Sequence, residues 1–251
     1  MPEAPTPIPA ATLVLMRDRA GAPPEILMVE RAKAMVFAGG ALVFPGGRVD
    51  PGDRALAAEL GGDAEDAPAR IAAIRETIEE AGVAVGLSPA PDAATLGALR
   101  AELHAGQSLG LLLDRHDLTL DLGALTWFAR WLPAHAHMRI FDTRFYLARA
   151  PDGFEAQVDD TENVRVFWAT AQAVLDDADA GRAHIIFPTR RNLERLAQYA
   201  SYDDAVAAAH AFPPRTITPW SEDRDGLPHL CIPDDQDYPV TSEILNSAIR
   251  G

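Results

Sequence analysis

Short apolar runs separated by turn-forming residues dominate the first part of this chain. Residues 11–16 and 25–30 are rich in aliphatic side chains and predict two strands. The intervening residues 20–24 contain Gly and two Pro and predict the turn that joins them. A loop is expected at 34–40, and the apolar run at 41–44 predicts a third strand.

The rest of the chain alternates between the strand period and the helical period of 3.6 residues. Predicted helices cover residues 95–104, 108–114, 170–180, 188–199 and 202–211, and predicted strands cover 83–87, 125–132, 143–150 and 163–169. After the two prolines at 213–214 the chain is rich in Pro and Asp and predicts one or two short strands at most. Strands interspersed with helices favour an α/β fold with a mixed sheet between helices.

A chain of 251 residues is long enough to bury a sizeable core. Residues 1–9 are expected to form a flexible N-terminal lead. Residues 10–215 are expected to form the main domain, with helical insertions, and residues 216–251 a C-terminal extension packed on it.

One predicted helix, ending at Ala81, has two chemically opposite faces. Its apolar face consists of Ile71, Ile74, Ile78 and Ala81, and its acidic face of Glu76, Glu79 and Glu80. Asp63 and Asp66 are candidate N-caps and Gly82 is suited to the C-terminal stop. Carboxylates three and four residues apart repel unless a cation lies among them, and Mg²⁺ or Mn²⁺ prefers such oxygen ligands. By itself, however, an acidic face is also common on solvated surface helices.

A glycine turn precedes this helix. The strand at 41–44 runs into Pro45, Gly46 and Gly47, where glycine permits positive φ and close approach to the backbone. Asp50 and Asp53 add acidic groups to the same loop. Together with the acidic helix, this loop predicts a cradle for a metal-bound diphosphate.

The two segments together resemble the signature box of the Nudix hydrolase family. That box is Gly, five residues, Glu, seven residues and then Arg-Glu-U-x-Glu-Glu-x-Gly-U, where U is aliphatic. The matching residues are Gly47, Arg75, Glu76, Glu79, Glu80, Gly82 and Val83. The resemblance implies an enzyme with the Nudix-type α/β/α sandwich, in which residues 95–116 and 185–211 are helical additions that cover the substrate cleft.

The chain departs from the family pattern at three points. Asp53 replaces the first Glu and is one methylene shorter, so its contact must be made differently. Thr77 occupies an aliphatic position. The 21 residues at 54–74 stand where the pattern has seven, and their richness in Ala, Gly and Asp predicts a surface excursion that leaves the acidic helix intact.

This insertion is similar to one in the coenzyme A diphosphatase subgroup of the family, and residues 44–50, 73–77 and 139–145 also resemble that subgroup. The resemblance implies hydrolysis of coenzyme A or acyl-coenzyme A to 3′,5′-ADP and (acyl-)phosphopantetheine, with Mg²⁺ or Mn²⁺. An ADP-ribose or NADH pyrophosphatase is the alternative within the enzyme class. A non-catalytic Nudix-fold nucleotide-binding regulator is the alternative outside it.

The resemblance also implies roles for individual residues. The metal ligands would be Glu76, Glu79, Glu80 and a backbone carbonyl at Gly47 or Gly46. Glu76 or Glu162 would act as the general base, and Arg75 would pair with an acid of the glycine loop. The residues expected to bind substrate are Gly46, Gly47, Arg48 and Arg144.

Composition narrows the range of partners and compartments. A net charge of −15 argues against a nucleic acid or an anionic membrane as the main partner and leaves a small nucleoside diphosphate substrate. The single cysteine, Cys231, excludes an internal disulfide and is typical of the cytoplasm. No signal peptide or membrane-spanning run is evident. A homo-oligomer is compatible with the sequence.

Arginines recur on the predicted helix at 188–199. Arg190, Arg191 and Arg195 give it a basic side that either binds a ribose 3′-phosphate or forms an ordinary solvated helix face.

Overall fold

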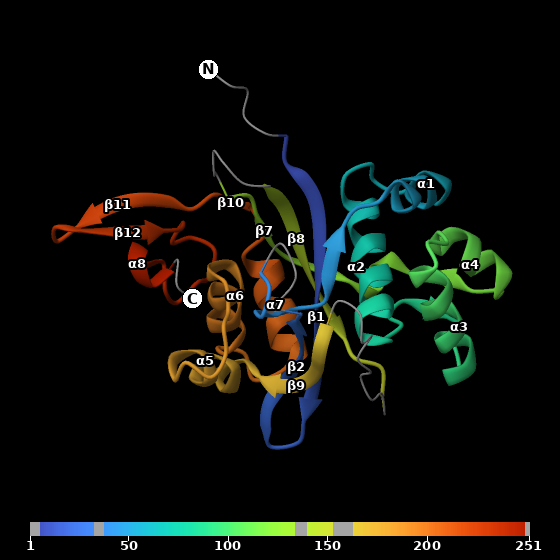
Figure 1. Cartoon of the computed structure of the whole chain (residues 1–251), viewed down its shortest axis with the longest axis horizontal. Coiled ribbons are helices and arrows are strands. Elements are labelled where there is room, and N and C mark those ends of the chain that lie inside the picture. The colour runs from blue at the N-terminus through green and yellow to red at the C-terminus, as the bar shows by residue number, and fades with distance from the viewer. Residues whose placement is uncertain (1–5, 33–37, 134–139, 153–162, 249–251) are drawn as a thin grey trace.

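The computed structural model describes residues 6–32, 38–133, 140–152 and 163–248 (Figure 1). Its centre is an eight-stranded mixed sheet with the strand path β10-β7-β8-β1-β2-β3, to which β4 adds beside β1 and β9 beside β2. Its strands are β1 (Ile8–Arg19), β2 (Ala22–Arg31), β3 (Leu42–Val43), β4 (Gly46–Arg48), β7 (Thr126–Trp131), β8 (Phe141–Arg149), β9 (Asn163–Thr170) and β10 (Thr216–Ile217). The pairs β1–β8 and β7–β10 are parallel and the others are antiparallel, so the mixed sheet is confirmed.

Strand β1 is central because both of its faces are apolar. Leu13 and Leu15 pack into the hydrophobic cluster on one side of the sheet, whereas Val14 and Met16 pack into the cluster on the other. All four side chains are fully buried. The alternation follows from the two-residue period of a strand and shows that helices must cover both faces.

Helices form a layer on each face of the sheet (Figure 1). One layer contains α1 (Pro51–Glu59), α2 (Asp66–Ala81), α3 (Ala93–His104) and α4 (Leu109–Arg115), and the other contains α5 (Ala171–Asp179), α6 (Phe187–Leu196) and α7 (Tyr202–Ala211). The helical character predicted for 95–116 and 185–211 is confirmed, and the two additions lie on opposite faces. None of the helices in the described residues is both long and apolar enough to cross a membrane.

The predicted surface excursion at 54–74 is wrong. Most of these residues belong to α1 and to the first half of α2, and only a turn at 60–65 separates the helices. Leu56, Ala69 and Ile71 from this segment are buried in the core cluster. The insertion is therefore a helical hairpin, and most of its alanines are core contacts, namely Ala57, Ala67, Ala69, Ala72 and Ala73.

The C-terminal segment is also more ordered than predicted. It contributes β10 to the main sheet and then a small antiparallel sheet of β11 (Trp220–Arg224), β12 (Leu227–Cys231) and β13 (Ser242–Ile244), followed by α8 (Leu245–Ala248). In the first half of the chain the strand expected at 83–87 is reduced to β5 (Leu87–Ser88), which pairs with β6 (Thr119–Leu120) ahead of a 3₁₀ turn at Leu122–Ala124. Such short strands depend on partners far away in sequence, which local periodicity cannot reveal.

Candidate active site at the acidic helix

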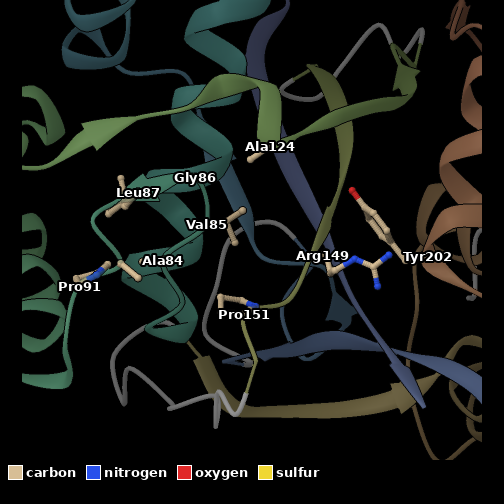
Figure 2. A pocket seen from close by; sticks show the side chains of 10 residues that line it. Ala84, Val85, Gly86, Leu87, Pro91, Ala124, Arg149, Pro151 and Tyr202 are labelled. Atoms are coloured by element: carbon tan, nitrogen blue, oxygen red, sulfur yellow. The ribbon is translucent and has the colours of Figure 1, made fainter. Parts of the chain in front are cut away.

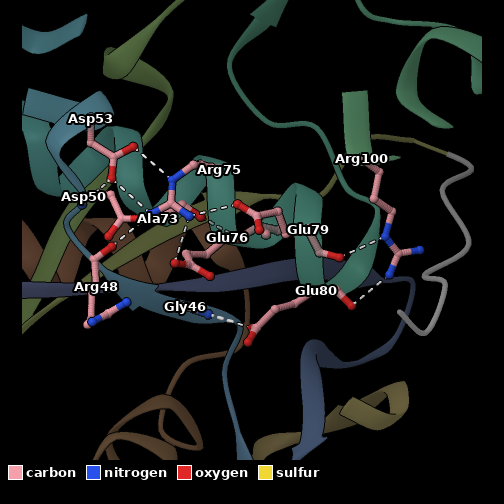
Figure 3. Close-up of polar contacts among 11 residues, drawn as sticks. Gly46, Arg48, Asp50, Asp53, Ala73, Arg75, Glu76, Glu79, Glu80 and Arg100 are labelled. Carbon is pink, nitrogen blue, oxygen red and sulfur yellow. Dashed lines mark hydrogen bonds and ion pairs between the residues drawn. The ribbon is translucent and has the colours of Figure 1, made fainter. Parts of the chain in front are cut away.

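The C-terminal half of α2 is held firmly at its end. Gly82 adopts the left-handed conformation with φ +66°, and its N–H donates to the Ile78 carbonyl at 2.9 Å. The Arg100 guanidinium of α3 donates to the carbonyls of Glu79 and Glu80 at 2.8 and 3.2 Å (Figure 3). A cation at this end complements the negative pole of the helix dipole, so the last two turns have a fixed position.

Thr77 has a local explanation at a position where the family pattern is aliphatic. Its hydroxyl donates to the Ala73 carbonyl one turn earlier at 2.7 Å, and the side chain is fully buried. The hydroxyl is therefore satisfied within the helix, and its methyl group can serve the core in place of an aliphatic side chain.

The glycine segment packs against α2 as a short strand, not as the predicted turn. Gly46 and Gly47 pair with Thr12 and Ala11 of β1. The Gly46 N–H donates to Glu80 Oε2 at 3.0 Å (Figure 3). A Cβ on Gly47 would overlap the Glu76 carboxylate, and one on Gly46 would overlap the backbone of β1. Close backbone approach, which is one of the two properties expected of these glycines, is confirmed.

Arg75 connects the acidic groups around α2 (Figure 3). Its Nε and Nη2 donate to the two carboxylate oxygens of Asp53 at 3.0 Å each. Its Nη1 donates to Glu76 Oε1 at 2.9 Å and to Glu79 Oε1 at 2.8 Å. Nη2 also donates to the Arg48 carbonyl at 2.9 Å. The predicted pairing of Arg75 with an acid is confirmed, with α1 rather than a loop supplying that acid.

Asp53 is a structural partner of the arginine. It is 1% exposed, and its Oδ2 also accepts the Asp50 N–H at 2.8 Å at the start of α1. A bidentate carboxylate–guanidinium pair is strong and fixes orientation. The shorter side chain thus makes its contact by being carried on a helix that packs directly against α2.

Burial raises the pKa of two of the three glutamates, Glu80 and Glu76. Withdrawal from water raises the pKa of Glu80 to about 8, with the charge of Glu76 adding to the effect and the Gly46 N–H opposing it. Burial likewise raises the pKa of Glu76 to about 7, although the Arg75 charge opposes the rise. Burial by itself lowers the pKa of Arg75, but its hydrogen bond to Asp53 and the surrounding carboxylates raise that pKa far above its usual range.

The chemistry of this donor set suits a hard divalent cation. Within the described residues, no three His, Cys, Asp or Glu side chains converge as a ready-made metal site. Glu76 and Glu79 direct one oxygen each to Arg75, and Glu80 directs one to Gly46. The other oxygens of these three carboxylates are hard ligands of the kind that such a cation prefers.

The remaining predicted site residues are less closely connected to the glutamates. The Arg48 side chain is exposed, and only its carbonyl contacts Arg75. Arg144 is buried in β8 and donates to the carbonyl and carboxylate of Glu65 at 3.0 Å each. Glu162 lies outside the described residues.

Two residues near Glu80 were missed by the sequence analysis. Asn163 hydrogen-bonds Glu80, and the Arg31 charge acts on the same carboxylate, each lowering its pKa. Asn163 and Arg31 are register partners at the ends of β9 and β2. Only the pairing of these two strands brings them to the helix, and the position of Asn163 directly after Glu162 was the one local signal.

A cavity of about 380 Å³ lies elsewhere, lined mainly by apolar residues at 84–91 together with Arg149 and Tyr202 (Figure 2). None of the predicted site residues lines it. Arg149 is occupied by ion pairs with Asp18 and Asp203 at 2.6 and 2.7 Å. The charged chemistry is therefore at α2, and α2 defines the candidate site.

A mixed sheet between helices, with an arginine-anchored acidic helix beside a Gly-Gly strand, is the arrangement expected from the resemblance to Nudix hydrolases. The chain is 27% identical over 228 residues to "Putative nudix hydrolase 7" of Caenorhabditis elegans, a match that covers 90% of this chain and 73% of that protein. It superposes on the NUDIX hydrolase from Alicyclobacillus acidocaldarius with a TM-score of 0.71 and 29% identity, over 80% of this chain and 96% of the other. No family model matches the chain.

These two relatives support the Nudix hydrolase family, and with it an enzyme. Nudix hydrolases generally use divalent metal ions.

Proposed function

We propose that this protein hydrolyses a nucleoside diphosphate linked to another moiety, with coenzyme A or acyl-coenzyme A as the first substrate class. Mg²⁺, or Mn²⁺ in its place, would be held by Glu76, Glu79, Glu80 and the Gly47 carbonyl. The observation that carries the proposal is the convergence of buried Glu80 and partly buried Glu76 on the Gly46–Gly47 backbone. These carboxylates need a cation or a proton, as their raised pKa values indicate.

Arg75 and the Gly46 N–H would hold the metal-binding carboxylates in position. Arg75 holds one oxygen of Glu76 and one of Glu79, and the Gly46 N–H holds one oxygen of Glu80. A bound divalent cation would neutralise the diphosphate and acidify the attacking water. Glu76 or Glu162 would accept the proton of that water. Products would be 3′,5′-ADP and (acyl-)phosphopantetheine when the substrate is a coenzyme A compound.

The coenzyme A assignment is supported by the insertion inside the box and by the segment at 139–145, which resemble that subgroup in sequence. The insertion is a packed helical hairpin that contacts β8 through Arg144. This folded element beside the box provides a surface that a longer substrate would require. An ADP-ribose or NADH pyrophosphatase would use the same carboxylates with a different surrounding surface.

The test is incubation of the purified protein and Mg²⁺ with coenzyme A, an acyl-coenzyme A, ADP-ribose and NADH in parallel, with products identified by mass spectrometry. Release of 3′,5′-ADP in clear preference to the other products is the expected result. Preference for ADP-ribose or NADH would keep the hydrolase and refute the coenzyme A assignment.

A non-catalytic binder gives a different result in the same assay. It would show a ligand-induced rise in melting temperature with no product from any of the four compounds. Retention of all three helix glutamates favours turnover over binding alone.

A further inference from the structure

A second cavity, of about 220 Å³, lies where the insertion meets the sheet. We call it the insertion pocket. Arg54 and Glu65 reach it from the insertion, and Arg130, Asp142 and Arg144 reach it from β7 and β8. Pro9, Val49, Ala64 and Pro68 complete its walls. Neither the proposed metal ligands nor Arg75 lines it.

The charges of the insertion pocket are unbalanced toward positive. Arg130 and Asp142 neutralise one another through a bidentate pair at 2.8 and 2.6 Å. The Arg54 side chain is exposed and makes no hydrogen bond or ion pair with any residue that the structure describes. Arg144 is paired with Glu65, whose side chain is 77% exposed. In a chain of net charge −15, three arginines around one pocket favour the binding of an anion there.

Arg144, which lines this pocket, has unused hydrogen-bonding capacity. It is 7% exposed, and within the described part of the chain its Nε has no partner even though it is buried. A buried donor left without a partner costs free energy, so a ligand that accepts its hydrogen bond is favoured. The start of α2 also faces the pocket through Ala64, Glu65 and Pro68, and the positive end of its dipole favours negative charge there.

The sheet places this pocket next to the candidate active site. Ala11 of β1 pairs with Arg144 of β8 on one side and with Gly47 of β4 on the other. Two strand spacings therefore separate the Arg144 and Gly47 backbones, a distance of about 10 Å. A ligand group bound to Arg144 can belong to the same small molecule whose diphosphate lies beside Gly47.

We propose that the insertion pocket binds the dianionic phosphate group of a phosphomonoester, with Arg54 and Arg144 as its donors. When Glu65 turns into water, these two arginines provide two positive charges, which matches a phosphomonoester dianion. Guanidinium groups suit phosphate because they offer parallel N–H donors. Where the phosphate belongs to the substrate, as the ribose 3′-phosphate of coenzyme A does, this inference rests on the proposed function.

The first experiment measures binding without turnover. Inorganic phosphate is titrated into metal-free protein by isothermal calorimetry at low salt, with wild type, Arg54→Ala, Arg144→Gln and the matched control Arg182→Ala. Arg182 is also exposed, and its ion pair with Asp177 lies outside the pocket. Saturable binding by wild type and the control is expected, weakened about tenfold in each pocket variant. Absence of saturable binding, or unchanged affinity in Arg54→Ala, would overturn the proposal even if Arg144→Gln does not fold.

The second experiment identifies the source of the phosphate. The ratio of kcat/KM for coenzyme A to that for dephospho-coenzyme A, which lacks the 3′-phosphate, is compared in wild type and Arg54→Ala with Mg²⁺. A preference for coenzyme A that Arg54→Ala loses, with dephospho-coenzyme A turnover retained, assigns the pocket to the substrate. An unchanged ratio together with weakened phosphate binding assigns it to a separate phosphate ligand. Failure of all variants to hydrolyse either compound would refute the coenzyme A substrate and leave the calorimetric result to decide the pocket.

Discussion

At the scale of single residues, Glu80 shows how position determines chemistry. It is 5% exposed and has the Gly46 N–H and Asn163 as hydrogen-bond partners. Burial penalises its charged form, so its pKa is raised to about 8. A carboxylate in this environment takes up a proton or a cation, and that choice can be measured.

Removing the charge of one glutamate tests its role directly. Glu79→Gln and Glu80→Gln keep the side-chain shape, and kcat is expected to fall on the order of 100-fold or more in each because each glutamate is a proposed cation ligand. The melting temperature of Glu80→Gln in the absence of metal should not fall, since a buried charge has been removed, whereas Glu79→Gln also loses an ion pair with Arg75. Steady-state kinetics and thermal melts check this, and full activity in either variant would refute the assigned metal role.

The raised pKa values predict how stability depends on pH. Glu76 and Glu80 ionise at lower pH in the unfolded chain than in the folded one, so the folded state binds more protons between about pH 4.5 and 8. The melting temperature of metal-free protein should therefore fall by roughly 5 °C or more as pH rises through this window.

Mg²⁺ should reverse that fall at pH 8 and have little effect at pH 5, where the carboxylates are protonated. Glu80→Gln is the control, with a weaker pH dependence expected. Thermal melts at a series of pH values provide the measurement. A melting temperature of metal-free wild type that does not change with pH would contradict the prediction.

Gly47 tests the need for close backbone approach. In Gly47→Ala the new methyl group would overlap the Glu76 carboxylate, so a loss of about 1–3 kcal/mol in stability and a large loss of activity are expected. Gly97 has open space around its Cβ position within α3, and Gly97→Ala should be neutral or stabilising by roughly 0.5–1 kcal/mol. Denaturant unfolding and kinetics of both variants check this, and equal behaviour of the two would be inconsistent with the packing described.

At the scale of elements, the insertion and the acidic helix form one unit. Helix α1 places Asp53 under Arg75, and β8 holds the turn between α1 and α2 through Arg144 to Glu65 and the Tyr146 hydroxyl to Asp66 at 2.7 Å. The glutamates therefore depend on a charged pair that joins two helices. A long insertion is compatible with this site because its own helix supplies the anchoring acid.

Removing the Asp53–Arg75 pair should destabilise the packing of α1 against α2. Asp53→Ala leaves the buried Arg75 without its bidentate partner and is expected to cost about 3–5 kcal/mol. Asp50 lies 3.9 Å from Arg75, is half-exposed and is the N-cap of α1, so Asp50→Ala should cost only about 1 kcal/mol. Urea unfolding of the two variants makes the comparison, and a similar cost for both would show that Asp53 does not anchor the helix.

At the scale of the whole molecule, the C-terminal segment covers the hydrophobic cluster on the α5–α7 side of the sheet. Tyr238 is buried, accepts from Trp131 Nε1 at 3.3 Å and donates to Asn192 Oδ1 at 2.8 Å. Arg191 and Arg195 of α6 are 2% and 1% exposed, so the solvated helix face considered for these arginines is wrong. The C-terminal segment covers them, which residue type alone could not predict.

The contribution of the Tyr238 contact to the free energy of unfolding can be measured. Tyr238→Phe keeps the ring and removes the hydroxyl, leaving the buried Asn192 carbonyl oxygen without that donor, and a loss of about 1–3 kcal/mol is expected. Tyr202→Phe, at a half-buried tyrosine of α7, is the control and should have a smaller effect. Chemical unfolding checks both, and an unchanged stability in Tyr238→Phe would contradict the role of this contact.

The sequence by itself determined the elements whose signals are local. Apolar alternation predicted β1 and β2, helical periodicity and a terminal glycine predicted α2, and the conjunction of Gly47 with Arg75 and the three glutamates indicated the hydrolase family. These signals are local because the hydrophobic period, the helix cap and the motif spacing all involve residues that are close together in the chain.

Tertiary structure alone decided which distant groups meet. The pairing of β2 with β9 brought Arg31 and Asn163 to Glu80, and the packing of α1 on α2 made Asp53 an anchor. The fold of the insertion against β7 and β8 gathered Arg54, Arg130 and Arg144 around one pocket. Contacts between residues far apart in sequence depend on the closure of the whole core, and no local pattern encodes them.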